Sequence, residues 1–290
     1  MTMLYHYCSM ASLLKIIESA SIHCSNVSLA NDPNEIILAK RDVFPDFFQK
    51  LAGIPYHGID NTHEFFVLSL SRKPDALSQW RGYGDMGKGV MLELDLDVLK
   101  ACNYASSQCD SNVHILNDSV FGTPVFEAVD VIYNEQVFKA RLEEAFKHHD
   151  DGKLLKSIKE MDVTDINFIK FVNRLNGLSA CYKSAFYKEE DEVRCVIFSD
   201  TSEAGYRPNK LRGERWGEVI EQQVLFLESQ GKLSPRFPLR LKFKNLMALH
   251  GVMLGPANPN SVDMLQAVLQ KNGFADTKID KSVGYFRAPN

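Results

Sequence analysis

The sequence predicts an α+β protein with a mixed, mostly antiparallel β-sheet at its core. Short apolar runs of strand length lie early and late in the chain, and helical patterns are grouped between them. The 290 residues are 45% hydrophobic, which is enough to bury one sizeable core. No repeat or low-complexity linker marks a boundary, so we expect one domain over residues 1–290, with a helical insertion at about residues 135–183.

The N-terminal residues predict a strand, a helix and a second strand. Residues 3–7 and 22–25 have strand composition. Between them Ser9 is a suitable N-cap, because its hydroxyl can accept a hydrogen bond from the first helical turn. The apolar positions that follow recur at helical spacing: Met10, Leu13, Leu14 and Ile17. The stretch ANDPNE, residues 30–35, has turn composition, and a helix is expected from there to about residue 51.

The middle of the chain predicts four strands and an unusual loop. The strands are expected over residues 65–70, 87–95, 128–134 and 190–199. Residues 75–87 (DALSQWRGYGDMG) are rich in glycine and aromatic side chains, which suits a loop whose backbone passes close to another group.

The C-terminal part predicts two extended runs, a helix and a last strand. The runs cover residues 237–243 and 247–256, and the last strand covers 277–287. Asn260 or Ser261 can cap a helix that ends at Gly273.

Charge and cysteine content limit the functional classes. The formal net charge is −4, so a site for nucleic acid would have to be a local patch. The six cysteines are scattered without a Cys-x-x-Cys pair, which predicts reduced thiols in a cytoplasmic protein. We see no signal-peptide pattern and no apolar run of the ~18–20 residues that span a membrane, so no membrane partner is expected.

An acidic run leads directly into the strand at residues 190–199. On a strand, Glu190, Glu192 and Arg194 share one face, and Asp191, Val193 and Cys195 share the other. Such a face is either a surface ladder of ion pairs, which contributes little to stability, or a group of charges held at a ligand site.

Two other stretches have two interpretations each. His6, in LYHY, is either a satisfied core histidine or a ligand-binding group. Trp80, Arg81 and Tyr83 suit a ring-bearing, anionic ligand, since rings stack and a guanidinium binds anions. The alternative is a loop folded onto its own core.

Basic and metal-binding patterns are weaker. Arg240, Lys242 and Lys244 alternate along an expected strand and could contact the phosphates of a nucleic acid, or simply protect a sheet edge. No metal site is expected, because the adjacent residues 148–151 (HHDD) would point in different directions from a helix end. P-loop, Rossmann and G-x-S-x-G motifs are absent.

Taken together, LYHYCSMASLLKIIES, SNVSLANDPNE, LSQWRGYGDMGKGV, YKEEDEVR, HGVMLGP and a final S-x-x-Y-x-R resemble the bacterial DUF2971 family, a domain of unknown function. Cys8 stands where that pattern has Thr or Ser, and Val193 where it has Trp. The family is similar in turn to the ADP-ribosyltransferase superfamily. This second resemblance implies a split β-sheet that binds NAD as a substrate.

The resemblance also implies roles for individual residues. Glu192 would bond the ribose 2′-hydroxyl and stabilise the oxocarbenium-like transition state, with Glu190 as the second catalytic carboxylate. His6 would hold a ribose, Tyr83 or Trp80 would stack on the nicotinamide, and Arg81 would meet the pyrophosphate. The cofactor-binding set that it implies is His6, Tyr7, Ser9, Asn31, Trp80, Arg81 and Tyr83.

The expected function is therefore an NAD-dependent ADP-ribosyltransferase. The resemblance further implies a toxin or anti-phage effector that modifies RNA or DNA and has an antitoxin protein as a partner. The alternatives are an NAD glycohydrolase, a transferase that acts on protein, and a non-catalytic nucleotide-binding regulatory module.

Overall fold

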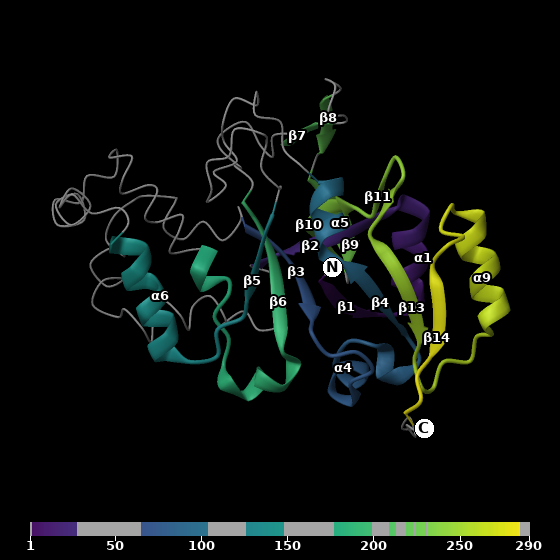
Figure 1. Ribbon diagram of the computed structural model, residues 1–290, viewed down its shortest axis with the longest axis horizontal. Coiled ribbons are helices and arrows are strands. Elements are labelled where there is room, and N and C mark those ends of the chain that lie inside the picture. Colours follow the sequence, from purple (N-terminus) through teal and green to yellow (C-terminus); the bar gives the residue numbers. More distant parts are fainter. Residues whose placement is uncertain are drawn as a thin grey trace.

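The structure is a computed structural model that describes residues 2–27, 65–103, 126–147, 177–198, 209–212, 219–222, 224–229 and 231–284. Most strands in these residues join one sheet with helices around it (Figure 1). Along the chain these strands are β1 (Met3–Cys8), β2 (Ser21–Asn26), β3 (Phe65–Ser71), β4 (Val90–Asp95), β5 (Glu127–Asp130), β6 (Glu192–Phe198), β9 (Leu225–Ser229), β10 (Lys232–Arg240), β13 (Leu249–Leu254) and β14 (Lys278–Lys281).

The sheet is mixed, as predicted. Neighbouring strands follow the order β14-β13-β4-β1-β3-β2-β10-β9, and β6 joins β3 and β5 outside this path. The pair of β13 with β14 is parallel, and the other pairs of this sheet are antiparallel. Two short hairpins stand apart from it: β7 (Asn209–Arg212) with β8 (Val219–Gln222), and β11 (Lys242–Phe243) with β12 (Leu246–Met247).

The sheet splits at β3. One edge of β3 pairs with β6 from Phe65 to Ser71. On the other edge β2 pairs with Phe66 and Val67, whereas β1 pairs with Ser71 at the opposite end of the strand. β1 and β2 therefore diverge, and the backbone of β3 around Ser69 faces the opening between them.

The helices follow local signals in the sequence. Ser9 accepts a hydrogen bond from the backbone of Ser12, and Ser261 accepts one from Met264, so both predicted N-caps are confirmed. The helices are α1 (Met10–Ser19), α4 (Leu77–Gly82), α5 (Leu96–Cys102), α6 (Glu135–Lys147) and α9 (Val262–Lys271), and η3 (Asp85–Gly87) and η4 (Ala185–Glu190) are 3₁₀ turns.

The two faces of the central strands bury different clusters. Leu4 and Cys8 of β1 lie in the main core, which α1, α5 and α9 also enter. Tyr7 of the same strand packs with Trp80 and Met91 in a second cluster. Because alternate side chains of a strand point to opposite faces, α4 covers the face that the main core does not use.

Two predicted elements were wrong in part. Residues 75–87 contain α4 and η3 rather than a continuous loop, because Trp80 is buried and anchors a helical turn. The close approach expected there is to the chain itself: a Cβ atom on Gly84 would lie 2.5 Å from the Trp80 ring. The extended run at 237–243 breaks after Arg240, where buried Leu241 precedes the separate β11 hairpin.

Other predictions fall partly outside the described residues. The turn at 30–35, the helix to residue 51 and residues 148–176 of the helical insertion are among them. In the described part of the insertion, α6 and residues 177–179 are helical. The last strand is shorter than predicted within these residues, since β14 ends at Lys281. The sequence analysis did not predict α5, β9 or the β7–β8 hairpin.

Candidate functional site

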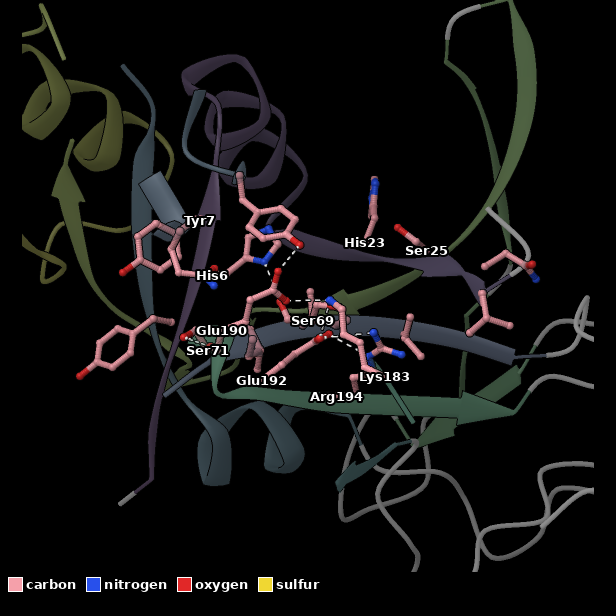
Figure 2. A pocket seen from close by; sticks show the side chains of 18 residues that line it. His6, Tyr7, His23, Ser25, Ser69, Ser71, Lys183, Glu190, Glu192 and Arg194 are labelled. Atoms are coloured by element: carbon pink, nitrogen blue, oxygen red, sulfur yellow. Dashed lines mark hydrogen bonds and ion pairs between the residues drawn. The ribbon is translucent and has the colours of Figure 1, made fainter. Parts of the chain in front are cut away.

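A cavity of about 220 Å³ lies where β1 and β2 diverge on β3 (Figure 2). Its lining comes from these three strands, from residues near α4 and from residues 183–194. Among the residues predicted from the sequence, His6, Tyr7, Tyr83, Glu190 and Glu192 line this cavity, whereas Ser9, Trp80 and Arg81 do not. Asn31 lies outside the described residues.

His6 occupies the opening between the strands. Its Nδ1 lies 3.2 Å from the carbonyl oxygen of Ser69, on the edge of β3 that faces the split. A carbonyl oxygen only accepts, so Nδ1 carries the proton and Nε2 is left as an acceptor. Burial lowers the pKa of His6, and the bond to Ser69 offsets part of that effect. His6 is therefore a neutral imidazole at pH 7.

The low pKa of His6 predicts a loss of stability on mild acidification. The unfolded chain takes up a proton near the ordinary value of 6.5, while folded His6 resists it, so stability is full above that pH and falls as the pH drops below it. One such proton contributes at most ~1.4 kcal/mol per pH unit. Urea unfolding at pH 7.5 and 5.5 should show a smaller loss for His6→Asn, whose amide can still donate to Ser69. Burial and Arg236 also lower the pKa of His23, so His23 accounts for the loss of stability that persists in His6→Asn. An identical loss in both proteins would contradict the assignment.

Tyr7 and Ser9 have structural contacts. The Tyr7 hydroxyl donates to the carbonyl of Lys73 at 2.8 Å and accepts from the backbone N–H of Ala76 at 3.0 Å. The rings of Tyr7 and Trp80 are in edge-to-face contact, with their centroids 4.8 Å apart. Tyr7 thus fixes the start of α4 against β1, while Ser9 caps α1.

Trp80 is part of the core. Its side chain is buried, and its Nε1 donates to the Asp75 carboxylate at 2.7 Å. The same carboxylate accepts from the Ser282 hydroxyl at 2.5 Å and from the Val283 N–H at 3.3 Å. Asp75 therefore joins α4 to the segment that follows β14. Arg81 is exposed on α4.

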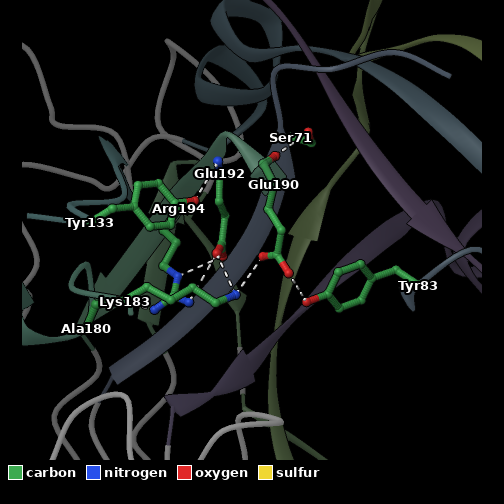
Figure 3. A network of polar contacts seen from close by, with 8 residues as sticks. All are labelled: Ser71, Tyr83, Tyr133, Ala180, Lys183, Glu190, Glu192 and Arg194. Carbon is green, nitrogen blue, oxygen red and sulfur yellow. Dashed lines mark hydrogen bonds and ion pairs between the residues drawn. The ribbon is translucent and has the colours of Figure 1, made fainter. Parts of the chain in front are cut away.

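The acidic run turns sharply before it enters the sheet. Glu190 ends η4, Asp191 adopts the left-handed conformation with φ 47°, and Glu192 begins β6. This turn brings the carboxylates of Glu190 and Glu192 to the same ammonium group (Figure 3). Glu192 and Arg194 share a face of β6, as predicted, and Val193 on the opposite face enters the main core, but the prediction that Glu190 belongs to the same strand was wrong because the chain turns at Asp191.

Lys183 and Arg194 hold these two carboxylates. Lys183 Nζ lies 2.7 Å from Glu190 Oε2 and 3.1 Å from Glu192 Oε2. Arg194 donates from Nε to Glu192 Oε1 at 2.8 Å and from a terminal nitrogen to Oε2 at 3.3 Å. The side chains of Lys183, Glu192 and Arg194 are only 5–6% exposed, so the network is buried and is not a surface ladder.

Tyr83 closes the network from the end of α4. Its hydroxyl donates to Glu190 Oε1 at 2.9 Å. Burial raises the pKa of Tyr83, and Glu190 adds to the rise although Lys183 opposes it, so the phenol keeps its proton. Burial alone would raise the pKa of Glu192, but Arg194 and Lys183 outweigh it and bring the pKa below its usual value. Glu192 is therefore ionised at neutral pH.

The charges of this network cancel. Lys183 and Arg194 supply two positive charges, and Glu190 and Glu192 supply two negative ones. A buried network of this kind is costly to assemble and strongly destabilising to break at one member. It provides rigid carboxylates, a tyrosine donor and a neutral imidazole around one cavity, which suits recognition of hydroxyl and amide groups.

The predicted basic face has other contacts. Arg240, at the end of β10, donates to the carbonyl of Cys102 at the C-terminus of α5. Lys242 donates to the carbonyl of Asn272, the C-cap of α9. Lys244 lies over the ring of Phe243. Cations commonly stabilise the C-terminal ends of helices, so the contacts of Arg240 and Lys242 have a structural explanation.

Sequence reasoning missed Lys183 and Tyr133. The Tyr133 hydroxyl accepts a hydrogen bond from the backbone N–H of Glu192 at 3.1 Å. Lys183 is positioned by an isolated bridge between Ile132 and Tyr182, and no local sequence pattern predicts such a contact.

The described residues contain no group of three or more side chains that could together hold a metal ion. No helix among the described residues is long and apolar enough to cross a membrane.

Comparison with known proteins identifies part of the chain. No curated protein and no solved structure matches it. Residues 79–195 match the model of a family described as a protein of unknown function (DUF2971). This segment belongs to DUF2971. The family predicted from the sequence is thereby confirmed. The DUF2971 segment includes Tyr83, Lys183, Glu190, Glu192 and Arg194, and His6 precedes it.

Proposed function

We propose that this DUF2971 protein is an ADP-ribosyltransferase that uses NAD as its substrate. The observation that carries the proposal is that His6, Tyr83 and the pair Glu190–Glu192 line one cavity although up to 186 positions separate them in the sequence. The divergence of β1 and β2 on β3 supports it as well, because the superfamily that the sequence resembles binds NAD on a split sheet.

The cavity suits one end of the dinucleotide. Its volume of about 220 Å³ lies below the ~300–1,000 Å³ of pockets that enclose a drug-sized ligand. Its charges cancel, so it offers hydroxyl and amide recognition rather than a surplus of positive charge. The nicotinamide riboside part of NAD has those groups, and the phosphates would lie towards the solvent.

In the proposed reaction the bond between ribose C1′ and the nicotinamide nitrogen breaks, and its electron pair leaves with neutral nicotinamide. Glu192 stabilises the positive charge that develops on the ribose, since it is ionised and held by several hydrogen bonds. A hydroxyl or amine of the acceptor then bonds C1′ and gives up its proton to water. His6, through Nε2, accepts a hydrogen bond from a ribose hydroxyl.

The prediction of the acceptor rests on the sequence resemblance alone. A nucleic acid remains the predicted acceptor, and a toxin or anti-phage role with an antitoxin partner remains predicted with it. The contacts of Arg240 and Lys242 with helix ends give no support to a phosphate-binding face at those residues. The acceptor is therefore decided by the experiment below.

A specific observation favours a second function, a non-catalytic nucleotide-binding module. Both oxygens of Glu192 already accept from Arg194 or Lys183, so a ribose hydroxyl has to compete with these cations. A protein that binds the nucleoside without cleaving it would tolerate a carboxylate whose acceptor positions are mostly used by these cations.

Incubation of the chain with NAD labelled in the adenylate phosphate tests these functions. RNA, DNA and protein are offered as separate acceptors, and nicotinamide release is measured by chromatography. We expect nicotinamide release together with label in the nucleic-acid fraction. Label in protein would move the acceptor to that class, and label found only in free ADP-ribose would indicate a glycohydrolase. Binding by calorimetry without nicotinamide release would replace the proposal with the non-catalytic module.

A further inference from the structure

We propose that Lys183 is a positioning residue of this site, which holds Glu190 and Glu192 side by side as charged carboxylates. The effect on turnover rests on the proposed function, whereas the effect on the carboxylates does not. Lys183 itself acts through these two side chains. The argument is geometric: one ammonium reaches both carboxylates, at 2.7 Å and 3.1 Å, inside a buried network.

The backbone of Lys183 is held by contacts that do not involve the carboxylates that its side chain binds. Its backbone N–H donates to the carbonyl of Ile132 at 3.0 Å, and the backbone N–H of Ile132 donates to Cys181 at 2.7 Å. The lysine is thus tied to the segment after β5, while the acids belong to η4 and β6. Its Nζ also lies 4.6 Å from the centre of the Tyr187 ring. An ammonium whose backbone is anchored beside Ile132 therefore holds one carboxylate of η4 and one of β6.

The ammonium offsets a repulsion that the chain creates. Two carboxylates bound to the same nitrogen atom lie close together, and like charges at such a distance disfavour joint ionisation. Arg194 bonds Glu192, but Lys183 bridges both acids. Without the ammonium the pair is expected to take up a proton more readily.

Other titratable groups face this pair and bear on its titration. Tyr83 approaches from α4 and Tyr133 from the segment after β5, and each hydroxyl keeps its proton because burial raises its pKa. Other titratable or charged groups near the pair, among the residues that the structure describes, include Arg194 on β6, Tyr187 on η4, His6 on β1 and Cys181, which lies two residues before Lys183. Lys183 is the cation among these that bridges the two acids, so its removal should have the largest effect on them.

The first test needs no NAD. The chain is labelled with ¹³C at the glutamate carboxyl carbon, and the signals of Glu190 and Glu192 are assigned with Glu190→Gln and Glu192→Gln. In Lys183→Met we expect the pair to titrate at least one pH unit higher than in the wild type, because a tenfold change in proton affinity equals one unit. Lys183→Arg, which keeps a cation, should restore most of the wild-type titration. An unchanged titration in Lys183→Met overturns the proposal.

The second test measures nicotinamide release against pH. In Lys183→Met, kcat should fall about tenfold for each pH unit below the raised titration, while KM changes little and Lys183→Arg recovers activity. If the wild type releases no nicotinamide but the carboxyl titration responds to Lys183, the proposed function fails and the positioning role stands. If nicotinamide is released and the titration does not respond, the positioning role fails alone.

A third measurement covers a Lys183→Met chain that does not fold. In the wild type, the ¹⁵N signal of the Lys183 ammonium is followed through the acid titration. It should respond to protonation of both carboxylates, because Nζ bonds each of them. A signal that follows only one of the two would overturn the proposal.

Discussion

Glu192→Gln should slow nicotinamide release from NAD by about 10²–10³-fold. The amide keeps the size of the side chain but carries no negative charge to stabilise the ribose cation. It also leaves Arg194 and Lys183 with less compensation, so the variant should be less stable as well. Single-turnover nicotinamide release, measured well below the unfolding temperature of both proteins, separates the loss of rate from the loss of fold.

Glu189→Gln is the matched control for this change. It makes the same substitution in the same acidic run, but the Glu189 side chain is exposed and its contact with Lys73 uses the backbone carbonyl. It should keep the wild-type rate. If folded Glu192→Gln also kept it, Glu192 would have no part in bond cleavage.

Arg194→Met should lower the free energy of unfolding by about 3–5 kcal/mol, the usual result of leaving a buried charge without its partner. The guanidinium donates twice to Glu192 and also donates to the carbonyl of Ala180. After the substitution Glu192 keeps Lys183, which it already shares with Glu190. Urea unfolding at pH 7 measures the loss.

Two further variants sharpen this comparison. Arg72→Met removes a guanidinium from an ion pair with Asp130 whose side chains are 45% and 61% exposed, so it should cost no more than ~1 kcal/mol. The double variant Glu192→Leu/Arg194→Met removes both charges and should cost less than the sum of the two single changes. Equal losses of unfolding free energy for Arg72→Met and Arg194→Met would contradict the prediction that burial makes the Arg194 pair more costly to break. Simple additivity in the double variant would contradict a coupling between Glu192 and Arg194.

The elements that were predicted correctly depend on local chemistry. Ser9 and Ser261 cap helices because a hydroxyl before an apolar helical pattern satisfies the first free backbone donors. β3 and β6 were found because their apolar residues form uninterrupted or alternating runs. α5 was missed because it begins directly after β4, with no turn residues between them. Its N-cap, Asp95, is also the last residue of β4.

The site was predictable only in part. The shared face of Glu192 and Arg194 follows from strand alternation, but the approach of His6 to this region depends on pairing between distant strands. Trp80 shows the limit of composition: a tryptophan next to glycines is equally compatible with a ligand and with a core, and here it packs in the core. Lys183 depends on a single bridge to Ile132, and periodicity carries no information about such a contact.

Asp75 connects the segment that follows β14 to the cavity. It binds Trp80, which anchors the helix that leads to Tyr83, and it also binds Ser282 and Val283. An insertion or a truncation placed just after β14 would therefore disturb the contacts of Asp75 with Ser282 and Val283. It would weaken the anchor of α4 at Trp80 and, through Tyr83, the hydrogen bond that reaches Glu190.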